Sequence, residues 1–243
     1  MMTNNYANSS TKHTTQRSTV APAYTDQQGS RHSTGESGLP SLEALAVLTD
    51  ALEAKDPYTR DHCSSVARVA VLVGRHLGWE GLQLDHLHYA ALLHDVGKIG
   101  IPDDILLKPA RLLPEEYEAI QCHAKIGSDL INQITSLSVI APIILHHHER
   151  FDGLGYPHGL CGDEIPLASR ILGVVDALDA MTSPRPYREA LSLPEAMAEL
   201  QRYAGSQFDP DVVVLVSEVL DSDLLKEMPT GREIPISFAS IAA

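Results

Sequence analysis

A histidine and an aspartate stand side by side where an apolar run ends. His94 and Asp95 follow the apolar residues 90–93, and Gly97 and Lys98 come just after them. The spacing predicts a helix that carries the pair toward a core, with Gly97 ending the helix as a left-handed cap. Ionisable side chains in a core are usually paired or bound to a metal ion. We therefore expect this pair to have partners elsewhere in the chain.

Five more side chains of metal-ligand type occupy inward-facing or helix-end positions of predicted helices. They are His62, His123, His147, His148 and Asp176. A single inward histidine is usually a core residue with satisfied hydrogen bonds, but so many on separate helices are hard to explain in that way. Imidazole and carboxylate groups without cysteine suit Fe, Mn, Ni or Zn and disfavour a structural zinc site. With the first pair they are too many for one ion, which favours two ions sharing a carboxylate inside a helical bundle.

Two ions in such a site would suit hydrolysis at phosphorus. Metal ions about 3.5–4 Å apart activate a bridging water and bind a phosphate oxygen. Lys98, one turn beyond Asp95, would balance negative charge in the transition state. The alternative for Lys98 is a cation that only interacts with the dipole at a helix C-terminus. Lys108, Arg111 and Arg150 likewise either add positive charge near an anionic ligand or are ordinary surface cations.

Apolar residues at helical spacing predict the elements that must position these groups. Helices are expected at residues 41–55, 58–77 and 81–95, from Pro114, from Ser138, from Leu167, from Leu193 and over residues 210–220. Residues 149–166 are rich in turn formers and form a long loop of a kind that is often functional. Since neither strand alternation nor a repeat is visible, we predict an all-α fold, a single bundle of seven to eight helices with a buried binuclear metal site. Residues 39–226 would form this domain, between a disordered polar tail at 1–38 and a C-terminal tail at 227–243.

The composition limits the classes of partner. The chain has 243 residues, a formal net charge of −14 and 44% hydrophobic residues. Nucleic acids and anionic membranes require a basic surface, so we expect neither as a partner. Cys63, Cys122 and Cys161 show no C-x-x-C spacing, the N-terminus is polar, and no apolar run approaches the roughly 20 residues of a membrane helix. These features favour reduced thiols and a cytoplasmic location.

Longer motifs resemble a known family. His94-Asp95 with the upstream His62 resembles the HD phosphohydrolase superfamily. More specific are HDVGKIGIP at 94–102, HHERFDGLGYPHGLCG at 147–162 and DALDAMTSPRPYR at 176–188. Together these motifs are similar to those of the HD-GYP family of bacterial cyclic di-GMP phosphodiesterases, over about residues 45–213. The resemblance implies a bundle of about seven or eight helices around two or three metal ions, usually iron or manganese.

The same resemblance assigns roles to individual residues. One ion would be held by His62, His94, Asp95 and Asp176. The other would be held by Asp95, His123, His147 and His148, so that Asp95 bridges the two ions. Asp95 and Lys98 are then the catalytic candidates, with Lys98 contacting phosphate. Tyr156, Arg185 and Arg188 match positions that approach the substrate.

One departure from the family pattern bears on the number of ions. Some members carry a glutamate four residues before the first ligand histidine, where it supports a third ion. Tyr58 stands at that position here and is a poor ligand, so we predict two divalent ions, Fe or Mn.

Three functions fit the motifs. The first is hydrolysis of cyclic di-GMP to pGpG, with further hydrolysis to GMP left open. The second is a catalytically weak sensor or scaffold that binds diguanylate cyclases or other signalling proteins through the Gly-Tyr-Pro loop. The third is a hydrolase of another cyclic dinucleotide or of a nucleotide monophosphate. The intact ligand set favours an enzyme, and the oligomeric state and the controlling signal are left open.

Overall fold

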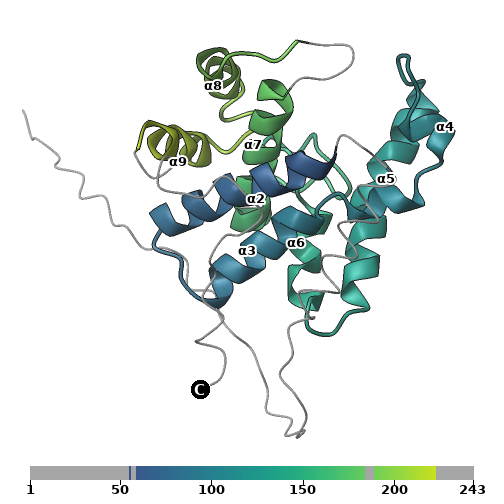
Figure 1. Cartoon of the computed structure of the whole chain (residues 1–243), viewed down its shortest axis with the longest axis horizontal. Coiled ribbons are helices and arrows are strands. Elements are labelled where there is room, and N and C mark those ends of the chain that lie inside the picture. The colour runs from purple at the N-terminus through teal and green to yellow at the C-terminus, as the bar shows by residue number, and fades with distance from the viewer. Residues whose placement is uncertain (1–54, 56–58, 184–188, 223–243) are drawn as a thin grey trace, which may run out of the picture. The chain divides into compact units, whose positions relative to one another are not determined.

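The helical periodicity of the sequence appears as a bundle of helices in the computed structural model, which describes Lys55 and residues 59–183 and 189–222 (Figure 1). These residues form eight α-helices and three short 3₁₀ helices. The α-helices are α2 (Thr59–His76), α3 (Leu82–Leu93), α4 (Asp103–Leu106), α5 (Pro114–Asn132), α6 (Ala141–Leu145), α7 (Leu167–Thr182), α8 (Leu193–Arg202) and α9 (Pro210–Asp221). The 3₁₀ helices are η1 (Val96–Gly100), η2 (Ser138–Ile140) and η3 (Gly162–Glu164). The all-α prediction is therefore confirmed, and β pairing within the described ranges is limited to two isolated bridges.

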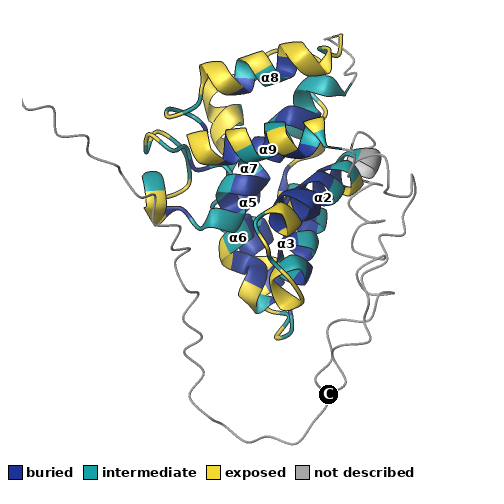
Figure 2. Cartoon of the chain, turned by 90° about the vertical axis from the view of Figure 1, so that its left-hand side faces the viewer, coloured by how far each residue is buried: buried dark blue, intermediate teal, exposed yellow. Residues whose placement is uncertain are grey.

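Two clusters of aliphatic side chains hold the helices together. The larger cluster joins α2, α3, α7, α8 and α9 through residues such as Leu72, Leu172 and Val216. The smaller joins α3 to α5 and α6 through residues such as Leu93 and Ile144. Figure 2 shows buried residues where α2, α3 and α7 face one another and exposed residues on the outer sides of α8 and α9. Because full burial of one Leu, Ile or Val contributes about 1.5–3 kcal/mol, these clusters fix the relative positions of the helices that surround the candidate site.

The predicted helix starts are marked by local capping contacts. At α8, Ser192 N donates to Glu195 Oε2 at 2.9 Å. At α9, Asp209 Oδ1 accepts from the backbone N of Asp211 at 2.9 Å. Such contacts satisfy backbone groups that a helix end leaves without partners. The predicted starts at Pro114, Leu167, Leu193 and Pro210 agree with the structure.

The end of α3 differs from the prediction. This helix ends at Leu93, and Asp95 has φ −92° and ψ 0°. Gly97 lies inside η1 and has no positive φ, so the left-handed cap assigned to it is wrong. The reason for glycine here is contact with α5, because a Cβ on Gly97 would lie 1.9 Å from the carbonyl oxygen of His123.

A short helix, α4, occupies part of the loop that was predicted after η1.

Three other predictions concern parts of the chain that the structure does not describe. The predicted helix at 41–55 and both predicted tail boundaries, at 38/39 and 226/227, fall outside the described residues except for Lys55. The helices that the structure describes are all too short or too polar to cross a membrane.

Candidate metal centre

The structure brings all seven predicted ligands together from five parts of the bundle. His62 comes from α2, His94 and Asp95 from the turn after α3, and His123 from α5. His147 and His148 follow α6, and Asp176 lies in the middle of α7. Six of them form two clusters in which potential ligand atoms lie within 4.8 Å of one another: His62, His94 and Asp176 in one, and His123, His147 and His148 in the other.

The first cluster contains two imidazoles and a carboxylate. His62 Nε2 lies 3.1 Å from Asp176 Oδ1, and His94 Nε2 lies 4.0 Å from the same oxygen. Asp95 Oδ2 approaches His94 Nε2 at 3.6 Å. Two Nε2 atoms and two carboxylates thus lie close together between the start of α2 and the end of α3.

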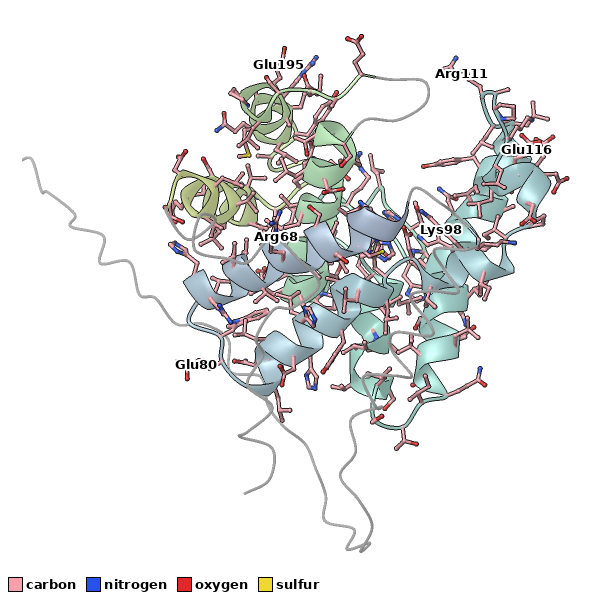
Figure 3. The ribbon with its side chains drawn as sticks, in the orientation of Figure 1. Arg68, Glu80, Lys98, Arg111, Glu116 and Glu195 are labelled. Carbon is pink, nitrogen blue, oxygen red and sulfur yellow. The ribbon has the colours of Figure 1, made fainter. Side chains whose placement is uncertain are left out.

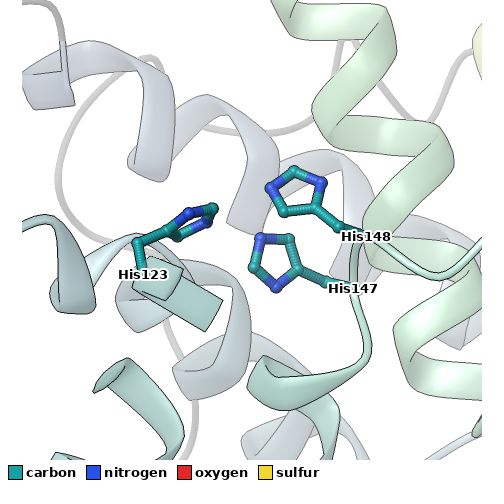
Figure 4. Close-up of side chains that lie close together, drawn as sticks. All are labelled: His123, His147 and His148. Carbon is teal, nitrogen blue, oxygen red and sulfur yellow. The ribbon is translucent and has the colours of Figure 1, made fainter. Parts of the chain in front are cut away.

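The second cluster contains three imidazoles, shown in Figure 4. The ring centroids of His123 and His148 are 5.0 Å apart, and those of His147 and His148 are 3.9 Å apart. The other oxygen of Asp95, Oδ1, lies 3.6 Å from His123 Nε2. One oxygen of Asp95 therefore faces each cluster, which is the arrangement that a bridging carboxylate requires.

Backbone contacts fix the tautomer of three of these histidines. In each, Nδ1–H donates to the carbonyl three residues earlier, at 2.8 Å for His94, 2.7 Å for His123 and 2.6 Å for His147. Because a carbonyl only accepts, Nδ1 carries a proton in each ring, and in the neutral form of the ring Nε2 presents a lone pair.

These lone pairs test whether the residues fit a metal ion. His123 Nε2 and His147 Nε2 are buried and have no hydrogen-bond partner among the described residues. A buried acceptor without a partner costs about 1–3 kcal/mol, which a bound cation would offset. The donor set, neutral nitrogen and ionised oxygen, is that of a transition-metal site. The residues therefore fit divalent metal ions.

His62 lies between two carboxylates. Its Nε2 faces Asp176, and its Nδ1 donates to Asp179 Oδ2 at 2.7 Å. Burial lowers the pKa of His62, but hydrogen bonds to Asp176 and Asp179 outweigh burial and raise this pKa to about 10. In the metal-free protein His62 is therefore an imidazolium. A metal ion at Nε2 would displace one proton and leave the bond to Asp179 in place.

Burial sets the charges of the remaining ligands. It lowers the pKa of His148 to about 4 and that of His147 well below its usual value, so both rings are neutral at pH 7. Burial opposes ionisation of Asp95, but Lys98 and His94 hold the pKa of its carboxyl well below the usual range. Neutral imidazoles and ionised carboxylates are the forms that bind metal ions.

The 3₁₀ helix η1 places the side chain of Lys98 beside the candidate centre. Its Nζ donates to Asp95 Oδ2 at 2.7 Å, three residues back along the chain. Figure 3 shows Lys98 between α2 and α5, and Arg111 at the outer end of the α4–α5 region. Of the two interpretations of Lys98, the structure supports a cation at the candidate centre.

Two of the other predicted cations, Lys108 and Arg150, have carboxylate partners of their own. Lys108 Nζ donates to both oxygens of Glu116 at 2.6 and 2.7 Å. Arg150 binds Asp152 through Nε at 3.0 Å and Nη2 at 2.6 Å. These contacts favour the interpretation of Lys108 and Arg150 as locally neutralised surface cations.

The loop after α6 closes one side of the centre. The ring of Tyr156 lies against that of His148, with centroids 4.9 Å apart and planes inclined by 37°. Glu149 is buried and holds the loop by accepting from the backbone N of His158 at 2.7 Å and of Leu160 at 3.1 Å. Tyr156 is therefore positioned beside the metal ligands, as the resemblance implies.

A small cavity adjoins the second cluster. It has a volume of about 180 Å³, and its lining includes His148, Asp176, Arg170 and Gln207. Pockets that enclose drug-sized ligands measure about 300–1,000 Å³. A ligand as large as a cyclic dinucleotide would therefore extend beyond this cavity across the surface.

Three contributors to the centre were missed by sequence reasoning. Asp179 orients His62, and Glu149 fixes the loop that carries Tyr156. Cys63 is buried with its sulfur near His94 and Asp95, and burial raises the pKa of this thiol so that it stays protonated. Asp179 lies one helical turn after Asp176, so its spacing in the sequence could have indicated that it faces the same site.

Three predicted residues cannot be placed. Arg185 and Arg188 lie outside the described residues, as does Tyr58.

Comparisons with known proteins agree with the geometry of the candidate metal centre. A family model described as an HD domain matches residues 46–212. A cyclic di-GMP phosphodiesterase of Thermotoga maritima is 41% identical over 174 residues, which cover 71% of this chain and 47% of that protein. A 3'3'-cGAMP-specific phosphodiesterase 3 of Vibrio cholerae is 36% identical over 195 residues, covering 75% of this chain and 42% of that protein. The chain thus spans about half the length of these relatives.

A solved structure shares the fold. The crystal structure of a cyclic GMP-AMP-specific phosphodiesterase of V. cholerae superposes with a TM-score of 0.61 at 22% identity, covering 76% of this chain and 49% of the other. At this identity the likeness concerns the fold, and it agrees with the predicted all-α architecture.

Proposed function

Because the chain belongs to the HD domain family, we propose that it is a metal-dependent phosphodiesterase that hydrolyses a cyclic dinucleotide, with cyclic di-GMP as the preferred substrate. One observation carries this proposal. Asp95 directs one oxygen to a cluster with His94 and the other to a cluster with His123, at 3.6 Å in both cases. A buried carboxylate between two groups of metal-ligand side chains suits two ions that share a ligand.

Each residue has a distinct task in the proposed reaction. Two divalent ions, Fe or Mn, would supply a water of lowered pKa and positive charge beside the phosphate. The first cluster with Asp95 would hold one ion, and the second cluster with Asp95 would hold the other. Lys98 donates to Asp95 and would keep its positive charge near the phosphate as negative charge develops in the transition state.

Substrate recognition would use the loop and the segment after α7. Tyr156 is stacked beside His148 and would offer its ring face to a base or ribose next to the centre. Arg185 and Arg188 are proposed to contact phosphate or guanine. The relatives' names support cyclic dinucleotides as a class, and they include both cyclic di-GMP and 3'3'-cGAMP.

The experiment compares both substrates with one ligand variant. The purified chain is loaded anaerobically with Mn²⁺ or Fe²⁺ and incubated with cyclic di-GMP or 3'3'-cGAMP, and linear and mononucleotide products are separated by chromatography. We expect turnover of cyclic di-GMP, and a loss of at least about 10²-fold in Asp95→Asn because the shared ligand is weakened. Asp129→Asn, which changes an exposed aspartate paired with Lys125, is the matched control and should be fully active.

Two results would contradict the proposal. One is the absence of turnover of both substrates with either metal. The other is equal turnover by the wild type and Asp95→Asn. Turnover of 3'3'-cGAMP alone would keep the enzyme class and reject the preferred substrate.

A further inference from the structure

A second group of metal-ligand side chains lies outside the proposed centre. His146 directly follows α6, Glu149 lies three residues later, and His158 lies further along the loop. One ligand atom from each of the three lies within 4.8 Å of the others. The group shares no residue with the two clusters around Asp95, and the proposed phosphodiesterase reaction does not use it.

The two histidines of this group already face each other through their nitrogens. His146 Nε2 and His158 Nδ1 are 3.1 Å apart. His146 Nδ1 donates to the carbonyl of Pro142 at 2.9 Å, so His146 Nε2 presents a lone pair. A single proton, on His158 Nδ1, therefore joins the two rings.

A cation can take the place of that proton with little movement. Zinc binds imidazole nitrogen at about 2.0–2.1 Å in tetrahedral geometry, which places two nitrogens about 3.3 Å apart. The observed separation of 3.1 Å is close to this value. His158 would move its proton from Nδ1 to Nε2, so both rings stay neutral. His158 is exposed, which leaves a route for a cation and its water from solvent.

Glu149 supplies the negative charge. Its two oxygens accept from the backbone N of His158 at 2.7 Å and of Leu160 at 3.1 Å. Each carboxylate oxygen has a further lone pair, so these hydrogen bonds leave capacity for a cation. Its burial places that charge in a site of reduced solvent screening.

We propose that His146, Glu149 and His158 form an accessory site for one divalent cation of the zinc type. Two imidazoles, one carboxylate and a solvent water complete a tetrahedral set. Zinc binds two imidazoles and a carboxylate more tightly than Mn²⁺ or Fe²⁺ does, so Zn²⁺ is the cation expected at this site.

The accessory ion would act on the loop that covers the centre. It would join the end of α6 to His158, two residues after Tyr156, whose ring lies on that of His148. At present this connection is made by one hydrogen bond, between the half-buried ring of His146 and the exposed ring of His158, and by the contacts of Glu149. A bound cation would hold the segment from Glu149 to His158 more firmly against α6, and so set how readily Tyr156 moves to admit a ligand.

The test measures zinc binding to the full chain with its centre already loaded with Mn²⁺. Zn²⁺ is added by equilibrium dialysis, and Zn and Mn per chain are measured by elemental analysis. We expect the wild type to bind one Zn²⁺ without losing Mn²⁺, and His158→Ala to bind it at least tenfold more weakly. His76→Ala is the matched control, since His76 is also exposed and is paired with Glu218 at 3.0 Å on another face; it should bind Zn²⁺ like the wild type.

A second readout tests the effect on the loop. Hydrogen exchange of residues 150–160 should slow on addition of Zn²⁺ in the wild type and in His76→Ala, but not in His158→Ala. Equal zinc binding by the wild type and His158→Ala, or zinc that enters only by displacing Mn²⁺, would overturn the accessory site. Zinc binding that requires His158 but leaves exchange of the loop unchanged would overturn its action on the loop. None of these outcomes depends on turnover, so they are separate from a failure of the proposed reaction.

Discussion

At the scale of single residues, the protonation states of the candidate ligands determine how the centre can bind metal ions. Nε2 of His123 and His147 is buried without a partner, whereas His62 is protonated between Asp176 and Asp179. Two kinds of ligand are therefore present: rings that already offer a lone pair, and one ring that must first lose a proton. This difference leads to a pH dependence that the sequence alone does not predict.

The pH dependence of metal binding follows from His62. Its pKa of about 10 means that the metal-free protein carries this proton throughout the neutral range. Rising pH removes the competing proton, so Mn²⁺ affinity should increase by about tenfold per pH unit between pH 7.5 and 8.5. The pKa of His148, about 4, is too low to contribute there. Isothermal titration across this interval measures the slope.

The control for this slope is Asp179→Asn. It removes one of the carboxylates that raise the pKa of His62, so the dependence on pH should become shallower. An affinity for Mn²⁺ that does not change with pH in the wild type would contradict the protonation of His62.

A second residue-scale prediction concerns Lys98. Replacing Lys98 with Met removes the cation at Asp95 Oδ2 without adding a charge. We expect kcat to fall by about 10²–10³-fold, the usual effect of removing one group that stabilises a transition state, with two metal ions still bound. Lys108→Met, which changes a lysine paired with Glu116, serves as control and should keep its kcat. Unchanged kcat in Lys98→Met would show that Lys98 has only the helix-dipole role.

At the scale of elements, the turn between α3 and α5 positions three groups at once. The 3₁₀ helix η1 brings Lys98 back to Asp95 and lies against α5 next to His123. Its close approach requires Gly97, since a Cβ there would meet the backbone of His123 at 1.9 Å. The contact therefore links the position of Asp95 to that of His123.

The close approach of η1 to α5 predicts a large effect of Gly97→Ala. Because the clash is with backbone atoms, it can be relieved only by moving η1 away from α5. We expect the free energy of unfolding of the metal-free protein to fall by about 3 kcal/mol, the upper part of the range for overpacking. Urea unfolding measures the change. In Gly100→Ala the nearest atoms belong to the flexible side chain of Ile126 at 3.1 Å, so the loss should stay under about 1 kcal/mol; equal losses in the two variants would contradict the argument.

The elements that sequence reasoning predicted are those set by local signals. Ser192 and Asp209 cap their helices through contacts two or three residues away, so their positions can be read from the sequence. The geometry of Gly97 could not be read in this way, because it depends on contact with His123 of α5, which lies much further along the chain. Local spacing suggested a left-handed cap, and a tertiary contact decided otherwise.

The same distinction applies to the candidate centre. The seven candidate ligands were predicted because each falls on an inward-facing or helix-end position, which local spacing in the sequence shows. The contribution of Asp179 depends on the pairing of α2 with α7, and that of Cys63 on the approach of α2 to the end of α3. Neither pairing is encoded within one helix. Sequence reasoning therefore proposed the candidate ligands and missed neighbouring groups, such as Asp179, which holds the ring of His62.

At the scale of the whole molecule, the charge of the protein opposes the binding of an anionic substrate. The formal net charge is −14, and Lys108 and Arg150 are paired with carboxylates. In the proposed function, attraction for a cyclic dinucleotide would then come from local positive charge, namely Lys98, the proposed metal ions and the proposed contacts of Arg185 and Arg188. We therefore expect substrate binding to depend on metal loading, because without the ions the carboxylates of Asp95, Asp176 and Asp179 would weaken the attraction for phosphate.

The most direct test of this account is anomalous diffraction at the manganese edge from crystals of the Mn²⁺-loaded protein. We predict two peaks, one bound by His62, His94, Asp95 and Asp176, and one bound by Asp95, His123, His147 and His148. Asp95 would contribute one oxygen to each peak, as its present contacts with His94 and His123 suggest. A single peak, or two peaks that do not share Asp95, would contradict the binuclear centre on which the proposed phosphodiesterase rests.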